Sequence, residues 1–393
     1  MPDLNIQFET SLLDIPSDEW NRLNSADNPF LKYEFLAALE TSKSVAPKTG
    51  WQPNHLAIRD NDKLIAAIPS YIKQHSYGEY VFDWSWADAY NQYGLHYYPK
   101  LLSAIPFTPS VGPRLLANNL DLDNGLSRRI FEAVKNHASK MGLSSWHLLF
   151  PDHASLEALS HPELMLRKGC QFQWCNRYGE TQSAKTGALM YDSFEQFLDQ
   201  MTSRKRKNIR KERQQVKDQG IRFIQFEGHE ITPQALEKFY LFYHATYLKR
   251  GQQGYLNQAF FQQITRSMPD NLLLVMAEKA GEYVAAALFL KDDQTLYGRY
   301  WGCMEEYKQL HFETCYYQGI DYCIKHKLER FDAGAQGEHK IQRGFKPVPT
   351  YSLHWIGHSG FRAAIQDFIK REAVQVDHYM DDAFRYLPFK RGS

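Results

Sequence analysis

The apolar and polar positions in the first half of the chain follow the periods of helices and strands. They predict helices at 17–24, 33–41 and 126–141, and strands at 55–59, 64–73, 146–150 and 172–176. The turn-forming triplet Asp60-Asn61-Asp62 joins the first two strands, so these should pair as a hairpin. Residues 84–114 combine prolines with many aromatic side chains and predict a long irregular loop.

The second half repeats this order on a larger scale. Helices are expected at 193–201, from there to about 219, at 233–249, 256–267 and 311–326, and at the C-terminus, and strands at 221–226, 272–278, 283–290, 295–301, 330–332 and 350–356. Short polar turns between 272 and 301 predict a meander. Since helices, antiparallel strands, then a helix and a strand occur in both halves, the pattern predicts a mixed α/β (α+β) fold of two similar domains, 1–180 and 181–393.

A length of 393 residues also favours two domains. The net charge of +1 argues against a dedicated nucleic-acid-binding protein, although it allows a local basic patch. The N-terminal residues lack the regions of a signal peptide, and no stretch approaches the ~20 apolar residues of a membrane span. Five cysteines without paired CxxC spacing indicate reduced thiols rather than disulfides or a zinc site. We therefore expect a cytoplasmic protein with no metal and no stable membrane insertion.

The segment 331–345 concentrates reactive side chains. Its three glycines, Gly334, Gly337 and Gly344, allow positive φ angles and a close approach of the backbone to a ligand. Between them stand a carboxylate, an imidazole and two cations, groups that can move a proton or hold an anion. The alternative is a glycine-rich turn with solvated charges. The expected catalytic residues are Glu338, His339 and Lys340, and the expected substrate contacts in this segment are Gln336, Gly337 and Arg343.

The strand at 295–301 carries further candidates. With a period of two, Tyr297, Arg299 and Trp301 share one face, where the arginine can stack and bind a carboxylate or phosphate. The alternative is an arginine paired with a structural acid. Glu313 and Tyr316 lie three residues apart near the start of the next helix and are also expected to contact substrate. A carboxylate at that place can instead complement the helix dipole.

Aromatic and basic side chains within 84–114 predict a platform with a cationic rim, suited to a sugar or an extended peptide. The alternative is a loop that buries its own aromatic side chains. The residues assigned to this platform are Trp86, Tyr90, Tyr97, Tyr98, Lys100 and Arg114.

A run of basic residues at 204–217 lies in a predicted helix. At helical spacing, one stripe is formed by Arg206, Arg210, Arg213 and Lys217. Such a stripe can neutralise the backbone phosphates of a nucleic acid in a salt-dependent way. A solvated helix face is the alternative.

Several longer motifs resemble those of the FemAB-like family, which has domains related to GNAT acetyltransferases and is associated with peptidoglycan biosynthesis or recognition. The resemblance extends from about residue 30 to 385. Its motifs are Trp86-Ala-Asp-Ala-Tyr90, Tyr97-Tyr-Pro-Lys-Leu101, Pro106-Phe-Thr-Pro109, Gly112-Pro-Arg114, Gly334-Ala-Gln-Gly-Glu-His-Lys340, Arg343-Gly-Phe345, Ser352 and His354-Trp355. The resemblance implies two GNAT-like domains, each a mostly antiparallel sheet flanked by helices, and a transferase activity.

The resemblance leaves two donors open, acyl-CoA and aminoacyl-tRNA, and fixes no cofactor. GNAT enzymes hold the pyrophosphate of their cofactor on a glycine-rich turn before a helix. The corresponding segment, 302–311, lacks the usual Arg/Gln-x-x-Gly-x-Gly/Ala spacing and carries two glutamates, which oppose a pyrophosphate. This departure fits the Fem-type transferases, which take aminoacyl-tRNA.

The leading hypothesis is a transferase with two domains facing each other across a cleft. It passes an acyl or aminoacyl group to an amine of a small-molecule or peptidyl acceptor, such as a peptidoglycan precursor. Glu338 or His339 removes a proton from the amine. A carboxylate or phosphate is held by Lys340, Arg343 and Arg299, and backbone N–H groups of the glycine-rich turn stabilise the oxyanion.

Two alternatives belong to other classes of protein. One is a module that recognises peptidoglycan or a peptide without catalysis. The other is an RNA-binding accessory protein that contacts tRNA through the basic stripe. The sequence does not define an oligomeric state.

Overall fold

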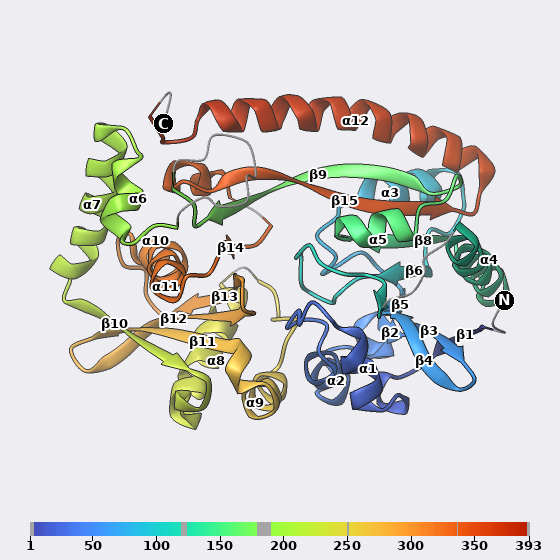
Figure 1. Ribbon diagram of the computed structural model, residues 1–393, viewed down its shortest axis with the longest axis horizontal. Coiled ribbons are helices and arrows are strands. Elements are labelled where there is room, and N and C mark those ends of the chain that lie inside the picture. The colour runs from blue at the N-terminus through green and yellow to red at the C-terminus, as the bar shows by residue number, and fades with distance from the viewer. Residues whose placement is uncertain (1–3, 119–123, 179–189, 250, 336, 391–393) are drawn as a thin grey trace. The chain divides into compact units, whose positions relative to one another are not determined.

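The computed structural model describes residues 4–118, 124–178, 190–249, 251–335 and 337–390 (Figure 1). The chain folds into two compact units, the first formed by Met1–Cys170 and Pro349–His378 and the second by Gln171–Val348 and Tyr379–Ser393. Strands β9 (Met165–Cys175) and β15 (Lys346–Ile356) and helix α12 (Ser359–Arg385) contribute residues to both units. The expected division into GNAT-like domains at residue 180 stays a prediction.

Two sets of strands organise the first unit. A four-stranded antiparallel sheet has the order β1-β3-β4-β7, with β1 (Asn5–Glu9), β3 (His55–Asp60), β4 (Lys63–Ile68) and β7 (Leu116–Ala117). The other strands follow the order β15-β8-β6-β5-β2, with β8 (Ser145–Leu149), β6 (Lys100–Ser103), β5 (Ser70–Lys73) and β2 (Trp51–Pro53). The helices are α1 (Ser17–Leu23), α2 (Tyr33–Thr41), α3 (Trp84–Gln92), α4 (Asn124–Met141) and α5 (His153–Ala158).

The predicted hairpin is confirmed as β3 and β4, which pair across the expected turn. The single strand expected at 64–73 is wrong, because Pro69 separates β4 from β5 and the two belong to different sheets. Proline has no N–H to donate to a strand ladder and is confined to strand ends and edges. The irregular loop expected at 84–114 is also wrong, since this range contains helix α3 and strand β6. Its prolines, which begin at Pro99, leave the first half free to form a helix.

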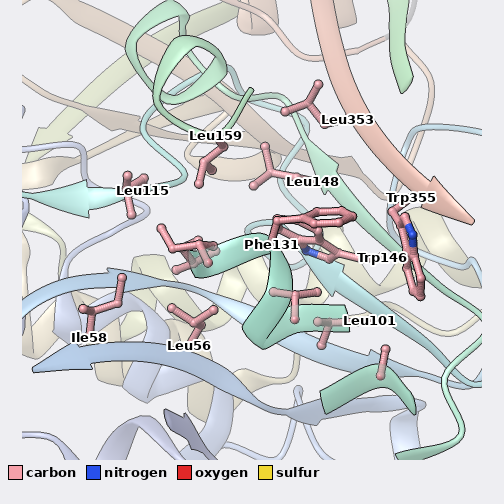
Figure 2. Packing of buried hydrophobic residues seen from close by; sticks show 14 of the residues in the cluster. Leu56, Ile58, Leu101, Leu115, Phe131, Trp146, Leu148, Leu159, Leu353 and Trp355 are labelled. Carbon is pink, nitrogen blue, oxygen red and sulfur yellow. The ribbon is translucent and has the colours of Figure 1, made fainter. Parts of the chain in front are cut away.

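The apolar core of the first unit lies on one face of the strands β5, β6, β8 and β15 (Figure 2). Leu101, Trp146 and Trp355 come from paired positions on neighbouring strands, so their side chains share this face. Helix α4 adds Ile130 and Val134, which lie one turn apart on its apolar side. Burying each large side chain stabilises the fold by roughly 1.5–3 kcal/mol.

The second unit has the strand order β10-β11-β12-β13-β14-β9 (Figure 1). The strands are β10 (Ile221–Glu227), β11 (Leu272–Lys279), β12 (Glu282–Lys291), β13 (Thr295–Cys303) and β14 (Arg330–Asp332), and the helices are α6 (Phe194–Asp199), α7 (Ser203–Asp218), α8 (Pro233–Leu248), α9 (Gln258–Ser267), α10 (Leu310–Phe312) and α11 (Gln318–His326). The expected meander is confirmed, because β11, β12 and β13 pair antiparallel. Strand β13 pairs with β14 in parallel through only Thr295–Tyr297, and the site lies beyond this pairing.

The continuous helix expected at 311–326 is interrupted. Helix α10 runs into a π-helical turn, Glu313–Tyr317, before α11 begins. A π-helical turn widens the helix by i→i+5 bonding and is found frequently at functional sites. The residues of this π-helical turn are therefore candidates for a functional site.

Helix α12 is the longest helix, with 27 residues, but charged side chains recur along its length. None of the helices in the described part of the chain is long and apolar enough to cross a membrane.

Candidate functional site

Strand β13 contains a one-residue bulge at the predicted Arg299 site. Opposite β12, Tyr300 pairs with Leu288 and Gly298 pairs with Phe289, which leaves Arg299 as the extra residue. A bulge of this kind bends the strand locally and changes the direction of the side chain at that position. The alternating pattern of the sequence does not reveal it, because the extra residue is compatible with either register.

The expectation that Tyr297, Arg299 and Trp301 share one face is therefore wrong. Tyr297 pairs with Leu290 and Trp301 pairs with Ala287, three residues apart on β12. Since directly paired residues share a face and successive residues alternate, Tyr297 and Trp301 lie on opposite faces of the sheet.

A cavity of about 140 Å³ lies beside this bulge. Its lining includes Ala287, Leu288 and Phe289 from β12, Arg299 and Trp301 from β13, and His311, Cys315 and Tyr316 from the following helical segment. A dry cavity of about 150 Å³ in another protein accommodates benzene, so this space admits a small group. Three of the predicted substrate contacts, Arg299, Trp301 and Tyr316, thus meet around one cavity.

The lining residues that were not assigned to the site from sequence include His311 and Cys315. Cys315 was missed because the sequence does not show the π-helical turn, which brings Cys315 to the cavity wall together with Tyr316. Burial raises the pKa of the Cys315 thiol well above its usual value. Cys315 therefore stays a thiol at neutral pH and is a poor nucleophile.

Arg299 forms a buried ion pair at the cavity wall. Its Nη2 atom donates to Oδ2 of Asp332 at 2.9 Å, and the two side chains are only 3% and 2% exposed. The other oxygen of Asp332 accepts from the backbone N–H of Gly334 at 2.9 Å. Arg299 is therefore paired with a structural acid, the alternative foreseen for it, and Gly334 does not offer its N–H to an oxyanion.

Tyr316 joins the cavity to His339. Its hydroxyl lies 2.8 Å from Nε2 of His339. Burial, aided by Arg343 and Lys340, lowers the pKa of His339, while burial raises the pKa of Tyr316. The imidazole is therefore neutral and the phenol protonated at neutral pH, the states needed for an imidazole to accept a proton through a tyrosine.

The glycine-rich turn has the expected backbone. Gly334, Gly337 and Gly344 have φ angles of +87°, +115° and +86°, a region that favours glycine. Lys340 is only 1% exposed and donates from Nζ to the carbonyl of Gly334 at 2.6 Å. Burial lowers the pKa of Lys340 to about 8. The buried Lys340 ammonium thus stabilises the turn by binding its backbone.

Glu338 lies on the exposed side of the 3₁₀ helix Glu338–Arg343. Its Oε1 atom accepts a hydrogen bond from the hydroxyl of Tyr379 at 3.1 Å. Gln336 lies outside the described residues. Within this segment it is therefore His339, rather than Glu338, that has a contact with a residue lining the cavity.

A family profile named FemAB-like, peptidoglycan biosynthesis/recognition, matches residues 11–391. The chain belongs to the FemAB-like family. No curated protein matches its sequence.

Two of the solved structures with similar folds match over nearly the whole chain. The C-terminal domain of a proposed lysylphosphatidylglycerol synthetase from Agrobacterium fabrum has a TM-score of 0.55 and 9% identity, over 91% of this chain and 96% of that one. FemX has a TM-score of 0.53 and 10% identity, over 90% of this chain and 98% of its own. These similarities confirm the Fem-type mixed α/β fold.

In this FemAB-like protein, Glu313 lies in a buried network rather than at the cavity. It is 4% exposed and accepts from Arg213 at 2.9 and 3.2 Å and from Gln318 at 2.9 Å. Burial raises the pKa of Glu313, although Arg213 opposes this shift. Arg213 also binds Asp321 at 2.6 Å. The network connects α7 to the π-helical turn, and a substrate contact by Glu313 stays a prediction.

Arg343 is held in a second network that reaches α7. Its Nη2 atom donates to Glu212 at 2.8 Å and its Nη1 atom to the carbonyl of His339 at 2.8 Å. The guanidinium also lies 3.5 Å from the ring centre of Phe312. Glu212 accepts a further hydrogen bond from Tyr317. Arg343 thus positions the backbone of His339, and anion binding by Arg343 stays a prediction.

The predicted basic stripe on α7 is largely paired with acids. Arg206 donates to Asp199 at 2.8 Å, Arg210 pairs with Glu195, and Arg213 faces the buried network. Lys217 is exposed.

A different set of basic side chains faces outward from α7. Arg204, Lys207 and Lys211 are exposed at helical spacing, and none forms an ion pair with any residue that the structure describes. This surface is the better candidate for an anionic partner, because its cations are not neutralised by neighbouring carboxylates.

The open aromatic platform expected in the first unit does not form. Trp86, Tyr97, Lys100 and Arg114 are at most 4% exposed, and Tyr98 is partly buried. The alternative, a segment that buries its own aromatic side chains, describes them better. The substrate contacts assigned to these residues stay predictions, and in this structure all of their side chains except that of Tyr98 are buried.

The polar groups of this segment have internal partners. Arg114 donates to the backbone carbonyls of Leu149 at 2.7 Å and Ser110 at 2.6 Å. Lys100 is bound by carboxylates, Glu79 and Asp83. The sequence shows that Arg114 and Lys100 are charged but gives no sign that they are buried, because their partners lie 4 to 35 residues away along the chain.

Proposed function

We propose that this FemAB-like protein transfers an acyl or aminoacyl group to an amine, with the reaction centred at the cavity beside Arg299. The carrying observation is the contact between Tyr316, which lines the cavity, and His339, which has a lowered pKa. A transferase of this kind needs a base for the amine and a small space for the acyl group. This protein offers a small cavity and a base in contact with its wall, because Tyr316 lines the cavity and its hydroxyl lies next to His339.

The proton path follows from the two side chains. As the amine nitrogen bonds to the acyl carbon, its proton passes to the oxygen of Tyr316 while the proton of Tyr316 passes to Nε2 of His339. The bond between the acyl carbon and the donor oxygen or sulfur then breaks. The imidazolium returns its proton through Tyr316 to this leaving atom, so the catalytic groups regain their starting states.

An aminoacyl-tRNA is the donor that fits the charges better. The segment after β13 exposes Glu305 and Glu306, which repel the pyrophosphate of a coenzyme A thioester. The exposed cations Arg204, Lys207 and Lys211 can bind an RNA backbone. The family description supports an amine of a peptidoglycan precursor as the acceptor.

A recognition module without catalysis is the second candidate. It is favoured by Arg299, which is neutralised by Asp332, and by Glu313, which is neutralised by Arg213. Those groups cannot act on a substrate without breaking buried ion pairs. Under this candidate a ligand binds and stabilises the protein but is never modified.

The test combines purified protein with aminoacyl-tRNA or coenzyme A thioesters and with cell-wall precursor peptides. Mass spectrometry of the acceptor is expected to show the added group, and Tyr316→Phe and His339→Gln are expected to lose it. The variant Glu338→Gln separates the two possible bases, since full activity in this variant excludes Glu338. Stabilisation of the protein by a peptide whose mass never changes would favour recognition without catalysis.

A further inference from the structure

In the first unit, the strands β5, β6, β8 and β15 have a second, polar face opposite the apolar core. Lys73 on β5 pairs with Lys100 on β6, and His147 on β8 pairs with His354 on β15. These side chains point away from the apolar core, and all four are at most 1% exposed. Lysine is almost never buried to this extent unless its charge is paired.

Residues 75–84, here called the cover segment, lie over the lysines. Nζ of Lys100 donates to Oγ of Ser76 at 2.7 Å, to Oε2 of Glu79 at 2.8 Å and to Oδ2 of Asp83 at 2.5 Å. Tyr97 donates to the same Asp83 oxygen at 2.6 Å. The cover segment is thus fastened by carboxylate oxygens that bind a lysine on the sheet.

Both carboxylates are only half satisfied. Oε1 of Glu79 and Oδ1 of Asp83 are buried and have no hydrogen-bond partner among the described residues. Oε1 of Glu79 lies 3.9 Å from Nζ of Lys73, beyond hydrogen-bond distance. In a network with a purely structural role, both oxygens of each carboxylate would normally accept hydrogen bonds. Apolar side chains in the same places would stabilise the unit as well or better.

The outer side of the cover segment is poorly buried. Tyr77, Phe82 and Trp84 leave 56%, 54% and 37% of their surface exposed. These aromatic side chains bury little apolar surface against the unit and stabilise the position of the cover segment only weakly. The segment is therefore kept in place largely by its contacts with the lysines.

We propose that the face formed by Lys73 and Lys100 is a binding site for a small anion, and that Glu79 and Asp83 occupy it in the closed state. The carboxylate oxygens on Lys100 mark where the oxygens of a phosphate or carboxylate ligand bind. Ligand binding displaces the cover segment and releases the two acids to water. This site does not depend on the transferase reaction, because it uses none of the residues assigned to that reaction.

The protonation of Glu79 and Lys73 is consistent with displacement, whereas Asp83 and Lys100 keep each other charged. Burial opposes this, but their pairing lowers the pKa of Asp83 and raises the pKa of Lys100. Burial raises the pKa of Glu79 to about 7 and lowers the pKa of Lys73 to about 6. In the closed state the charged forms of both groups are therefore disfavoured. Opening returns Glu79 to its ionised form in water, and a bound anion restores the charge of Lys73.

The proposal is tested by calorimetric titration of the full chain with inorganic phosphate, pyrophosphate and succinate at constant ionic strength. Glu79→Gln is expected to bind one of these probes at least tenfold more tightly than the wild type, because an amide binds the Lys100 ammonium more weakly than a carboxyl group does. Adding Lys73→Met to Glu79→Gln is expected to abolish the binding. The probe that binds distinguishes phosphate from carboxylate ligands.

A second readout is chymotrypsin cleavage after Tyr77 or Phe82, which the bound anion is expected to accelerate in the wild type. The matched control is Glu163→Gln, because Glu163 pairs with Lys135 and Arg362 in the same unit, away from the cover segment. This variant is expected to titrate like the wild type. The proposal is overturned if none of the probes binds folded Glu79→Gln, or if Glu163→Gln tightens binding equally.

Discussion

The hydroxyl of Tyr316 lies 2.8 Å from Nε2 of His339, and Tyr316 also lines the cavity beside the bulge of β13. This contact connects a space for a small group to a neutral base. The base is exposed enough to exchange its proton with water. Neither residue forms an ion pair or hydrogen bond with a carboxylate in the part of the chain that the structure describes, which distinguishes them from Arg299 and Glu313 with their buried ion pairs.

Removing the Tyr316 hydroxyl is expected to slow transfer without unfolding the protein. Because a positioned acid or base contributes about 10²–10⁴-fold to a rate, Tyr316→Phe should lower kcat by at least about 10²-fold. KM for the acceptor should change little, since the aromatic ring stays in the cavity wall. Steady-state kinetics measure both values. Tyr379→Phe, which removes only the hydroxyl bound to Glu338, serves as the matched control and should stay active.

The pH dependence of transfer should report His339. Burial lowers its pKa below the usual value of about 6.5, so the neutral base persists into mildly acidic solution. We expect kcat/KM to be constant near pH 7 and to fall as the pH drops through a value below about 6.5. His339→Gln should remove this acidic limb from any residual activity. An unchanged limb in that variant would assign the titration to another group.

Asp332 should stabilise the second unit strongly. Its ion pair with Arg299 is almost completely buried, and removing one partner of such a pair costs about 3–5 kcal/mol because the other charge stays unpaired. Asp332→Ala is expected to lower the free energy of unfolding by that amount in urea titrations. Asp382→Ala removes an exposed pair with Arg385 and should cost less than about 1 kcal/mol. Equal losses in both variants would contradict the buried role of Asp332.

Acid should destabilise the first unit through His147. Burial lowers the pKa of His147 to about 3, so the folded protein keeps the imidazole neutral. The unfolded chain binds the proton below pH ~6.5, and stability therefore falls as the pH drops. Between pH 6.5 and 5 this residue accounts for roughly 1.5 kcal/mol. Urea unfolding at several pH values should show a weaker dependence in His147→Gln, whereas the exposed His153→Gln should match the wild type.

The outward side of α7 should bind RNA more strongly than the predicted stripe does. Reversing Arg204, Lys207 and Lys211 to glutamate is expected to weaken tRNA binding and to lower the slope of its salt dependence by about one unit for each phosphate that is no longer neutralised. Reversal of Arg206 and Arg210, whose charges already meet Asp199 and Glu195, is the matched comparison. Filter binding across a salt series measures both sets. A larger loss of affinity from the reversal of Arg206 and Arg210 would restore the stripe expected from sequence.

Much of the fold could be predicted because local patterns determine it. Helix α2 has the predicted bounds, Tyr33–Thr41, and the strand at Arg330–Asp332 is likewise as expected. The glycines of the turn after that strand have the predicted positive φ angles. In these places the period of apolar residues, or the missing side chain of glycine, acts on its immediate neighbours.

The candidate site was predictable only in part, since its geometry depends on distant partners. The bulge at Arg299 is defined by pairing with β12, and the π-helical turn that places Cys315 at the cavity leaves the helical pattern of the sequence unchanged. The burial of Lys100 depends on Glu79 and Asp83. A charged side chain in the sequence gives no sign of whether water or a carboxylate will surround it.

The decisive measurement for the proposed catalytic centre is mass spectrometry of an amine acceptor incubated with aminoacyl-tRNA and purified protein. We expect the acceptor to gain the mass of the aminoacyl group with the wild type and with Tyr379→Phe, whereas Tyr316→Phe and His339→Gln should lose at least about 99% of this gain. Full transfer by folded Tyr316→Phe and His339→Gln would contradict the assignment of the Tyr316–His339 pair as the catalytic centre.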